Sequence, residues 1–178
     1  AYHEAGHAIV GHLLPHIDPV QLISVIPSGS ALGYTLNPPT EDKFSVYREE
    51  LKQEIAMLLG GRAAELVYYG PEEGLSTGPS GDLRTATSVA RRILCTYGMD
   101  ENFGLAAVDM DTARSGELTG EVRAAVNKML NQELAFTVEL IGYNRPAIDA
   151  LVRALLEKNQ LTGPEIDQIL KEHAVQGV

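Results

Sequence analysis

Apolar residues recur every three or four positions along most of the chain, which is the spacing that places them on one face of an α-helix. The clearest run keeps a period of about 3.6 residues through Leu51, Ile55, Leu58, Leu59, Ala63, Leu66 and Val67. Proline or glycine follows several of these runs, as expected where helices end. The pattern predicts helices over residues 2–14, 45–69, 82–97, 118–141, 144–158 and 162–170.

Two short segments depart from the helical pattern. Residues 20–26 are rich in β-branched side chains, and residues 32–36, after a Pro-Ser-Gly-Ser turn, are predicted to form a second short strand. They predict a β-hairpin, while residues 104–110 could be a further short strand or an extended loop. The edge of a small sheet could pair with an extended peptide or be covered by other structure, and the pattern leaves both readings open.

Composition narrows the possible partners. With 178 residues, 44% hydrophobic and 21% charged, the chain resembles an ordinary soluble globular domain with a substantial core. The net charge of -10, without a cluster of Lys and Arg, argues against nucleic acid as a partner. No apolar run approaches 18 residues, so we expect no direct membrane insertion by this chain. Its single cysteine, Cys95, cannot form an intrachain disulfide and is predicted to be buried.

The first predicted helix contains His3, Glu4 and His7, which form the H-E-x-x-H pattern of zinc metallohydrolases. Residues four apart lie on one helix face, so both imidazoles can point at one metal ion. Zinc lowers the pKa of a bound water from about 15.7 toward about 7, so the neighbouring Glu4 can take its proton. The pattern predicts a zinc hydrolase, and specifically a peptidase, although an amphipathic helix with two histidines on its polar stripe would share it.

A zinc site of this kind needs a third protein ligand from elsewhere in the chain. Asp82 begins a predicted helix after a loop over residues 70–81, and there it could cap the helix or bind the metal. Glu65, on the helix predicted over residues 45–69, could be a buried acid near the metal or could face solvent. The spacing of these residues does not decide between the alternatives.

Adjacent glycines, Gly60 and Gly61, interrupt the long predicted helix. In a helix interior they cost about 2 kcal/mol relative to two alanines. We expect close contact with another helix to compensate for this cost. Gly6, in the first predicted helix, could serve either a close approach near the metal or packing alone.

These elements predict a single domain that is mainly α with a small β-hairpin. Residues 1–110 carry the H-E-x-x-H helix and form a zincin-like, zinc-site lobe. Residues 111–178 contain no convergent cluster of His, Cys or acidic residues, and they are interpreted as a helical packing lobe at the C-terminal end.

Ordered stretches of this chain match one known family: His3–His7, Ala31–Thr35, Leu59–Glu65, Ser76–Leu83 and Tyr97–Met99. On these stretches the chain resembles the peptidase domain of the FtsH-type, membrane-anchored ATP-dependent zinc metalloproteases. With the helical tail, the likeness covers nearly the whole chain. A match of several stretches in order and spacing is far more specific than the H-E-x-x-H pattern alone.

The resemblance assigns roles to the candidate residues. It implies that Asp82 completes a Zn²⁺ site with His3 and His7, which would make the domain an aspartate zincin. Glu4 would be the catalytic residue, and Glu65 would support the site without binding the metal. The edge strand along which a polypeptide substrate lies would comprise Leu32, Gly33, Tyr34 and Thr35.

The implied function is that of a zinc metalloendopeptidase acting on unfolded or unfolding proteins. The chain lacks the G-x-x-x-x-G-K-[ST] pattern of a phosphate-binding loop, so ATP and Mg²⁺ would belong to an upstream AAA ATPase module preceded by membrane segments. Because the sequence starts inside a predicted helix, we expect a soluble fragment of a longer polypeptide. The full-length protein would be a membrane-anchored homo- or hetero-hexamer, with this domain in the bacterial cytoplasm or in an organelle matrix or stroma.

Two other functions are compatible with the sequence. The domain could be a catalytically silent, ring-forming module of an AAA assembly. It could also be a stand-alone zinc aminopeptidase, which would cleave short peptides without ATP. The intact set of His3, Glu4, His7 and Asp82 argues against the silent module, because such a module, with or without bound zinc, has no need of all four.

Overall fold

The computed structural model describes residues 1–27, 33–39, 45–105, 107 and 118–173. Its helices are α1 (Tyr2–Leu13), α2 (Arg48–Glu73), α3 (Ser80–Arg91), the π-helix η1 (Arg92–Thr96), α5 (Leu118–Tyr143), α6 (Arg145–Lys158) and α7 (Gly163–Glu172). Its strands are β1 (Leu22–Ser24), β2 (Tyr34–Leu36) and β3 (Gln160–Thr162). The predicted fold class, mainly α with a small β-sheet, is confirmed. None of the helices in these residues has the length and apolar character needed to cross a membrane.

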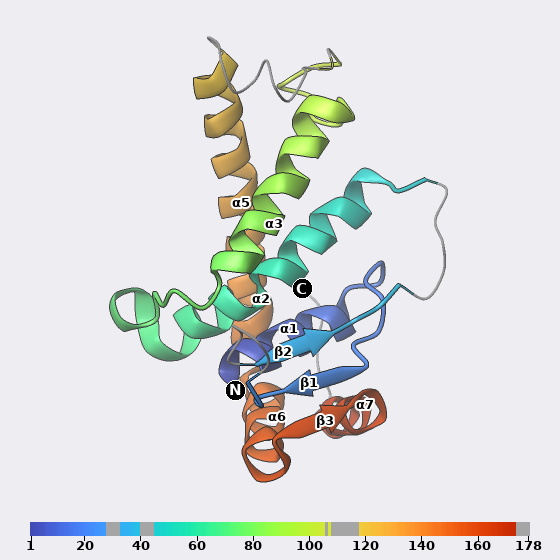
Figure 1. Ribbon diagram of the computed structural model, residues 1–178, viewed down its shortest axis with the longest axis vertical. Coiled ribbons are helices and arrows are strands. Elements are labelled where there is room, and N and C mark those ends of the chain that lie inside the picture. The colour runs from blue at the N-terminus through green and yellow to red at the C-terminus, as the bar shows by residue number, and fades with distance from the viewer. Residues whose placement is uncertain (28–32, 40–44, 106, 108–117, 174–178) are drawn as a thin grey trace.

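Helix α2 is central to the arrangement, because it packs against α1 on one side and α5 on another (Figure 1). Ala56 and Ala63 belong to a core shared with α1, α6 and the sheet. Ile55 and Leu59 belong to a second core shared with α3 and α5. The small side chains on the α1 side let the two helices approach closely, while the larger ones fill the second core.

The strands form one antiparallel sheet in the order β2–β1–β3 (Figure 1). Ile23 of β1 lies opposite Thr35 of β2 and Leu161 of β3, and Ile23 and Leu161 are completely buried. The predicted hairpin is therefore confirmed at its centre, and β2 is an edge strand of the described sheet. The sequence pattern does not predict β3, which follows α6 and whose last residue, Thr162, forms the capping box of α7 with Glu165.

The glycines of α1 and α2 mark the point where these helices cross. A Cβ atom on Gly6 would overlap the carbonyl oxygen of Gly60, and one on Gly60 would lie 3.0 Å from the carbonyl oxygen of Gly6 and 3.1 Å from the Cα atom of His7. The helices thus touch backbone to backbone where the histidine motif ends, at Gly6 and His7. The close helix contact expected from the adjacent glycines is confirmed.

Two element boundaries differ from the prediction. Helix α2 continues past Gly70, whose φ of 77° breaks the helical path, and Pro71 then begins one further turn. Proline is tolerated there because the first turn of a helix leaves its N–H groups unpaired. Helix α3 begins at Ser80, two residues before Asp82, and is continued by the π-helix η1.

Two smaller expectations concern Cys95 and the segment over residues 104–110. Cys95 is completely buried, as predicted. Residues 104, 105 and 107 belong to no strand, and the rest of that segment lies outside the described residues.

Candidate metal centre

Helix α1 places both histidines of the motif on one face, and α3 brings an acid to meet them. The Nε2 atoms of His3 and His7 lie 3.1 Å apart. One carboxylate oxygen of Asp82, Oδ2, lies 3.4 Å from Nε2 of His3 and 3.6 Å from Nε2 of His7. In the part of the chain that the structure describes, these side chains are the one group of His, Cys and acidic residues that could hold a metal ion.

These distances fit a tetrahedral zinc site. Zinc bonds to imidazole nitrogen and carboxylate oxygen are about 2.0–2.2 Å long, which places two ligand atoms of a tetrahedron about 3.3–3.6 Å apart. The observed separations of 3.1, 3.4 and 3.6 Å are close to that range. Two histidines and one carboxylate are also an established donor set for catalytic zinc.

Helix α2 orients both imidazole rings. Nδ1 of His7 lies 2.7 Å from the carbonyl oxygen of Met57, and Nδ1 of His3 lies 3.2 Å from Oε1 of Glu65. These oxygens accept, so each Nδ1 carries a proton and donates it to them. Each Nε2 can then donate to Asp82 while the ring is protonated, or offer its lone pair to a metal when the ring is neutral. Partners of this kind fix the tautomer of metal-binding histidines. Glu65 thus lies behind His3, and its carboxylate also accepts hydrogen bonds from Ser76 at 3.1 Å.

The electrostatics of the site keep Asp82 ionised. Burial alone would raise the pKa of Asp82, but the hydrogen bonds and charges of His3 and His7 hold that pKa well below its usual range. Burial alone would lower the pKa of His3, but the hydrogen bond to Asp82 and the charges of Glu4 and Asp82 raise it overall. A cluster that pairs an ionised carboxylate with two imidazoles is suited to a cation.

The position of Asp82 within α3 argues against one of its two predicted roles, helix cap and metal ligand. Pro79 occupies the N-cap, and Asp82 is the third residue of the helix, so the structure does not support the reading of Asp82 as the cap. The partial positive charge at a helix N-terminus favours a carboxylate in this first turn. The preceding loop is tied to α2, because Arg62 donates a hydrogen bond to the carbonyl oxygen of Ser76 at 3.0 Å.

The side chain of Glu4 extends from α1 toward the edge strand β2. Its side chain is 8% exposed, and Oε2 accepts a hydrogen bond of 2.8 Å from the hydroxyl of Thr35. Gly33 lies against the same carboxylate, because a Cβ atom there would be 2.9 Å from Oε1 of Glu4. Of the predicted substrate strand, Gly33, Tyr34 and Thr35 are described, while Leu32 lies outside the described residues. The sequence does not reveal the contact between Thr35 and Glu4, because it depends on how the sheet packs against α1.

Gly61 leaves room for the ring of His3, and this suggests a direct test. A Cβ atom on Gly61 would overlap the His3 imidazole. The ring, at the end of a flexible side chain, can move away, so we expect Gly61→Ala to fold but to bind zinc about 10- to 100-fold more weakly. Zinc titration against a chelating indicator measures the affinity, and thermal unfolding checks the fold.

The matched control for that test is Gly142→Ala on α5, where an added Cβ meets no atom within 4 Å. Its zinc affinity should equal that of the unsubstituted protein. Unchanged zinc affinity in Gly61→Ala would show that the His3 ring is not held by this contact.

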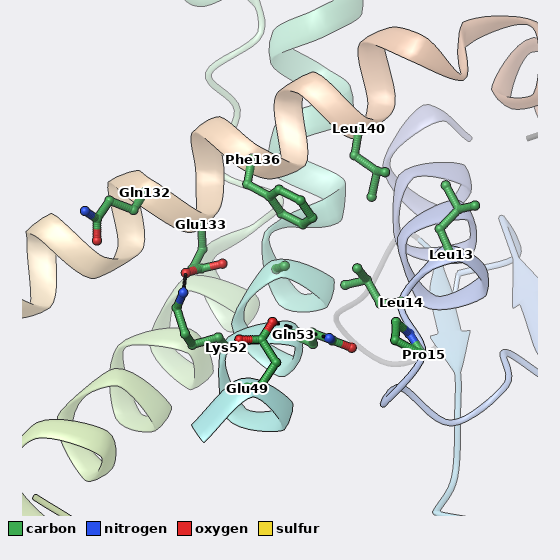
Figure 2. Close-up of a pocket in the computed structure, with 11 residues that line it drawn as sticks. Leu13, Leu14, Pro15, Glu49, Lys52, Gln53, Gln132, Glu133, Phe136 and Leu140 are labelled. Atoms are coloured by element: carbon green, nitrogen blue, oxygen red, sulfur yellow. Dashed lines mark hydrogen bonds and ion pairs between the residues drawn. The ribbon is translucent and has the colours of Figure 1, made fainter. Parts of the chain in front are cut away.

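A separate cavity of about 530 Å³ opens at the other end of α1 (Figure 2). Leu13 of α1 and Leu14, the residue that caps its end, line one side, and Phe136 of α5 lines another. Lys52 reaches across to Glu133, with 3.0 Å between the charged atoms. The ion pair accounts for these charged groups, so the cavity adds no second metal-binding cluster.

Comparison of the sequence with known proteins identifies the family of this chain. The sequence profile of peptidase family M41 matches residues 1–169. The chain is 42% identical over 175 residues to the ATP-dependent zinc metalloprotease FtsH 2 of Symbiobacterium thermophilum, and 39% identical over 185 residues to the ATP-dependent zinc metalloprotease FtsH of Pseudothermotoga lettingae. Each alignment covers 96% of this chain and 29% of the relative. The chain therefore spans less than a third of the length of these curated relatives. The resemblance to the FtsH-type proteases is confirmed, and this chain belongs to peptidase family M41.

Proposed function

We propose that the domain hydrolyses peptide bonds with a Zn²⁺ ion held by His3, His7 and Asp82, as an aspartate zincin. The observation that carries this proposal is the convergence of two imidazole nitrogens and one carboxylate oxygen within 4.8 Å of one another. The names of the relatives, which describe zinc metalloproteases, support the same metal and reaction class. Glu4, next in sequence to His3, is the proposed general base.

Each residue around the metal has a separate role in the proposed reaction. When bound, Zn²⁺ would supply Lewis-acid chemistry, which lowers the pKa of water and polarises a carbonyl group. Met57 and Glu65 hold the two imidazoles in the required tautomer. Glu4 accepts a proton from the attacking water and returns it to the leaving amine. The buried position of Glu4 keeps bulk water from competing for that proton.

We propose that an extended polypeptide pairs with the outer edge of β2, at Tyr34 and Thr35, and contacts the preceding residues Leu32 and Gly33. The position of β2 at the edge of the described sheet supports this, since backbone N–H and C=O groups are available there for a further strand. Backbone pairing holds a peptide largely independently of its side chains. Such binding suits an endopeptidase that acts on many unfolded sequences.

The activity of the whole protein is proposed from the relatives. Their printed names describe ATP-dependent proteases, and this chain covers less than a third of their length. We propose that the full-length protein unfolds substrates with ATP and Mg²⁺ in an upstream AAA module and assembles as a membrane-anchored hexamer. The peptidase domain would then face the bacterial cytoplasm or an organelle matrix or stroma.

The test of this function uses the full-length protein and two substrates. One is an N-acetylated fluorogenic peptide, and the other is a folded protein with an unstructured tail. We expect cleavage of both, with ATP required only for the folded substrate and with activity lost on zinc removal and restored by zinc. Failure to cleave either substrate in the zinc-loaded state would favour the silent module. Cleavage that requires a free amino terminus would favour the aminopeptidase.

A further inference from the structure

The side chain of Glu4 is held by a residue far away in sequence. Its oxygen Oε2 accepts a hydrogen bond of 2.8 Å from Oγ1 of Thr35 on β2. Within the described part of the chain, no other hydrogen bond reaches this carboxylate. Since Glu4 is 8% exposed, water cannot readily replace the hydroxyl, and the bond to an ionised acceptor is of the stronger kind.

The register of the sheet explains why Thr35 faces Glu4. Thr35 lies opposite Ile23, and residues directly opposite each other on paired strands share one face of the sheet. Ile23 is completely buried in the core that contains α1. The face of Thr35 is therefore the face that packs against α1.

Gly33 allows the strand to come this close. It lies directly before β2, two residues from Thr35, and it also faces Glu4. A Cβ atom there would lie 2.9 Å from Oε1 of Glu4 and 2.7 Å from the carbonyl oxygen of Ser24. Absence of a side chain at position 33 thus brings the carboxylate within reach of the Thr35 hydroxyl.

We propose that Thr35 is a positioning residue for Glu4, an inference that rests on the proposed peptidase function. Its hydroxyl fixes the carboxylate through Oε2 and leaves Oε1, which lies beside Gly33, to accept the proton. This role differs from the contact with substrate that the resemblance implies for Thr35. A peptide paired with β2 would therefore bind to the same strand whose Thr35 positions the general base, Glu4.

The test compares Thr35→Val with Thr35→Ser in the full-length protein. Valine keeps the β-branched shape and removes the hydroxyl, whereas serine keeps the hydroxyl. For the N-acetylated peptide, we expect Thr35→Val to lower kcat by about 10- to 100-fold, because a small misplacement of a catalytic group has effects of this size. KM should change by less than about twofold, and Thr35→Ser should restore most of kcat.

Three results would overturn the inference. A raised KM with unchanged kcat in Thr35→Val would assign Thr35 to substrate binding. Loss of zinc together with kcat would show that Thr35 maintains the fold of the site. Equal impairment of the serine and valine variants would show that the hydroxyl alone does not account for the effect of Thr35.

Thr137→Val is the matched control, because Thr137 is a completely buried threonine on α5. Among the described residues, its hydroxyl donates only to the helix carbonyl of Glu133, at 2.6 Å. Its kcat and KM should equal those of the unsubstituted protein. An inactive unsubstituted protein would reject the proposed function itself. An active one whose Thr35→Val variant keeps its kcat would reject only the role of Thr35.

Discussion

Replacing Glu4 with glutamine should abolish peptide cleavage while leaving zinc in place. Glutamine has the same shape and can still accept a hydrogen bond from Thr35, but its amide cannot take a proton from water. General-base catalysis contributes about 10²- to 10⁴-fold, so kcat should fall by at least that factor. The zinc content of the purified Glu4→Gln protein should match that of the unsubstituted protein, since Glu4 is not one of the three converging groups.

Glu157→Gln supplies the control for this substitution, because Glu157 is an exposed residue of α6. It should leave both kcat and zinc content unchanged. Measurable degradation of an unfolded protein by Glu4→Gln, at a rate near that of the control, would rule out Glu4 as the base.

Replacing Asp82 with asparagine should remove the metal. The neutral amide loses the negative charge that the two imidazoles now stabilise, as shown by the lowered pKa of Asp82. We expect the loss of zinc affinity to exceed the roughly 10- to 100-fold effect of losing a supporting partner. Zinc at 100 times its dissociation constant stabilises a folded protein by about 2.7 kcal/mol. Thermal unfolding of Asp82→Asn should therefore show little or no upward shift on zinc addition.

The control for Asp82 is another aspartate that contacts a histidine. Asp167 on α7 lies 3.2 Å from His12, with 65% of its side chain exposed. Asp167→Asn should retain full zinc content after dialysis, because an exposed pair of this kind contributes at most about 1 kcal/mol. Retention of zinc by Asp82→Asn under the same dialysis would reject Asp82 as a ligand.

Much of the fold could be predicted from local pattern. The helical period predicted α1, α2 and α5, and the last predicted helix, over residues 162–170, starts one residue before α7. The pattern could not predict β3, because its three residues are defined by pairing with β1 and not by their own composition. The end of α2 was also misjudged, because Gly70 and Pro71 look like a loop although they form a kink followed by a turn.

The candidate site, like the fold, could be predicted only where it depends on residues close together in sequence. Spacing alone linked His3 with His7, because both lie on one helix. It left Asp82 and Glu65 open, since their distance from the histidines depends on how α2 and α3 pack. Only the resemblance chose between them, and the structure now places Asp82 beside both Nε2 atoms and Glu65 behind His3.

Strand β3 also has a consequence for the order in which the molecule is built. Every proposed metal-binding and catalytic residue lies at or before Asp82, yet β1 needs β3, and α1 needs α6, to complete the core beneath them. Contacts between distant parts of a chain close late in folding. During synthesis, we therefore expect His3, His7 and Asp82 to bind zinc tightly only after α6 and β3 have left the ribosome. A half-made chain would then carry the motif without a working protease.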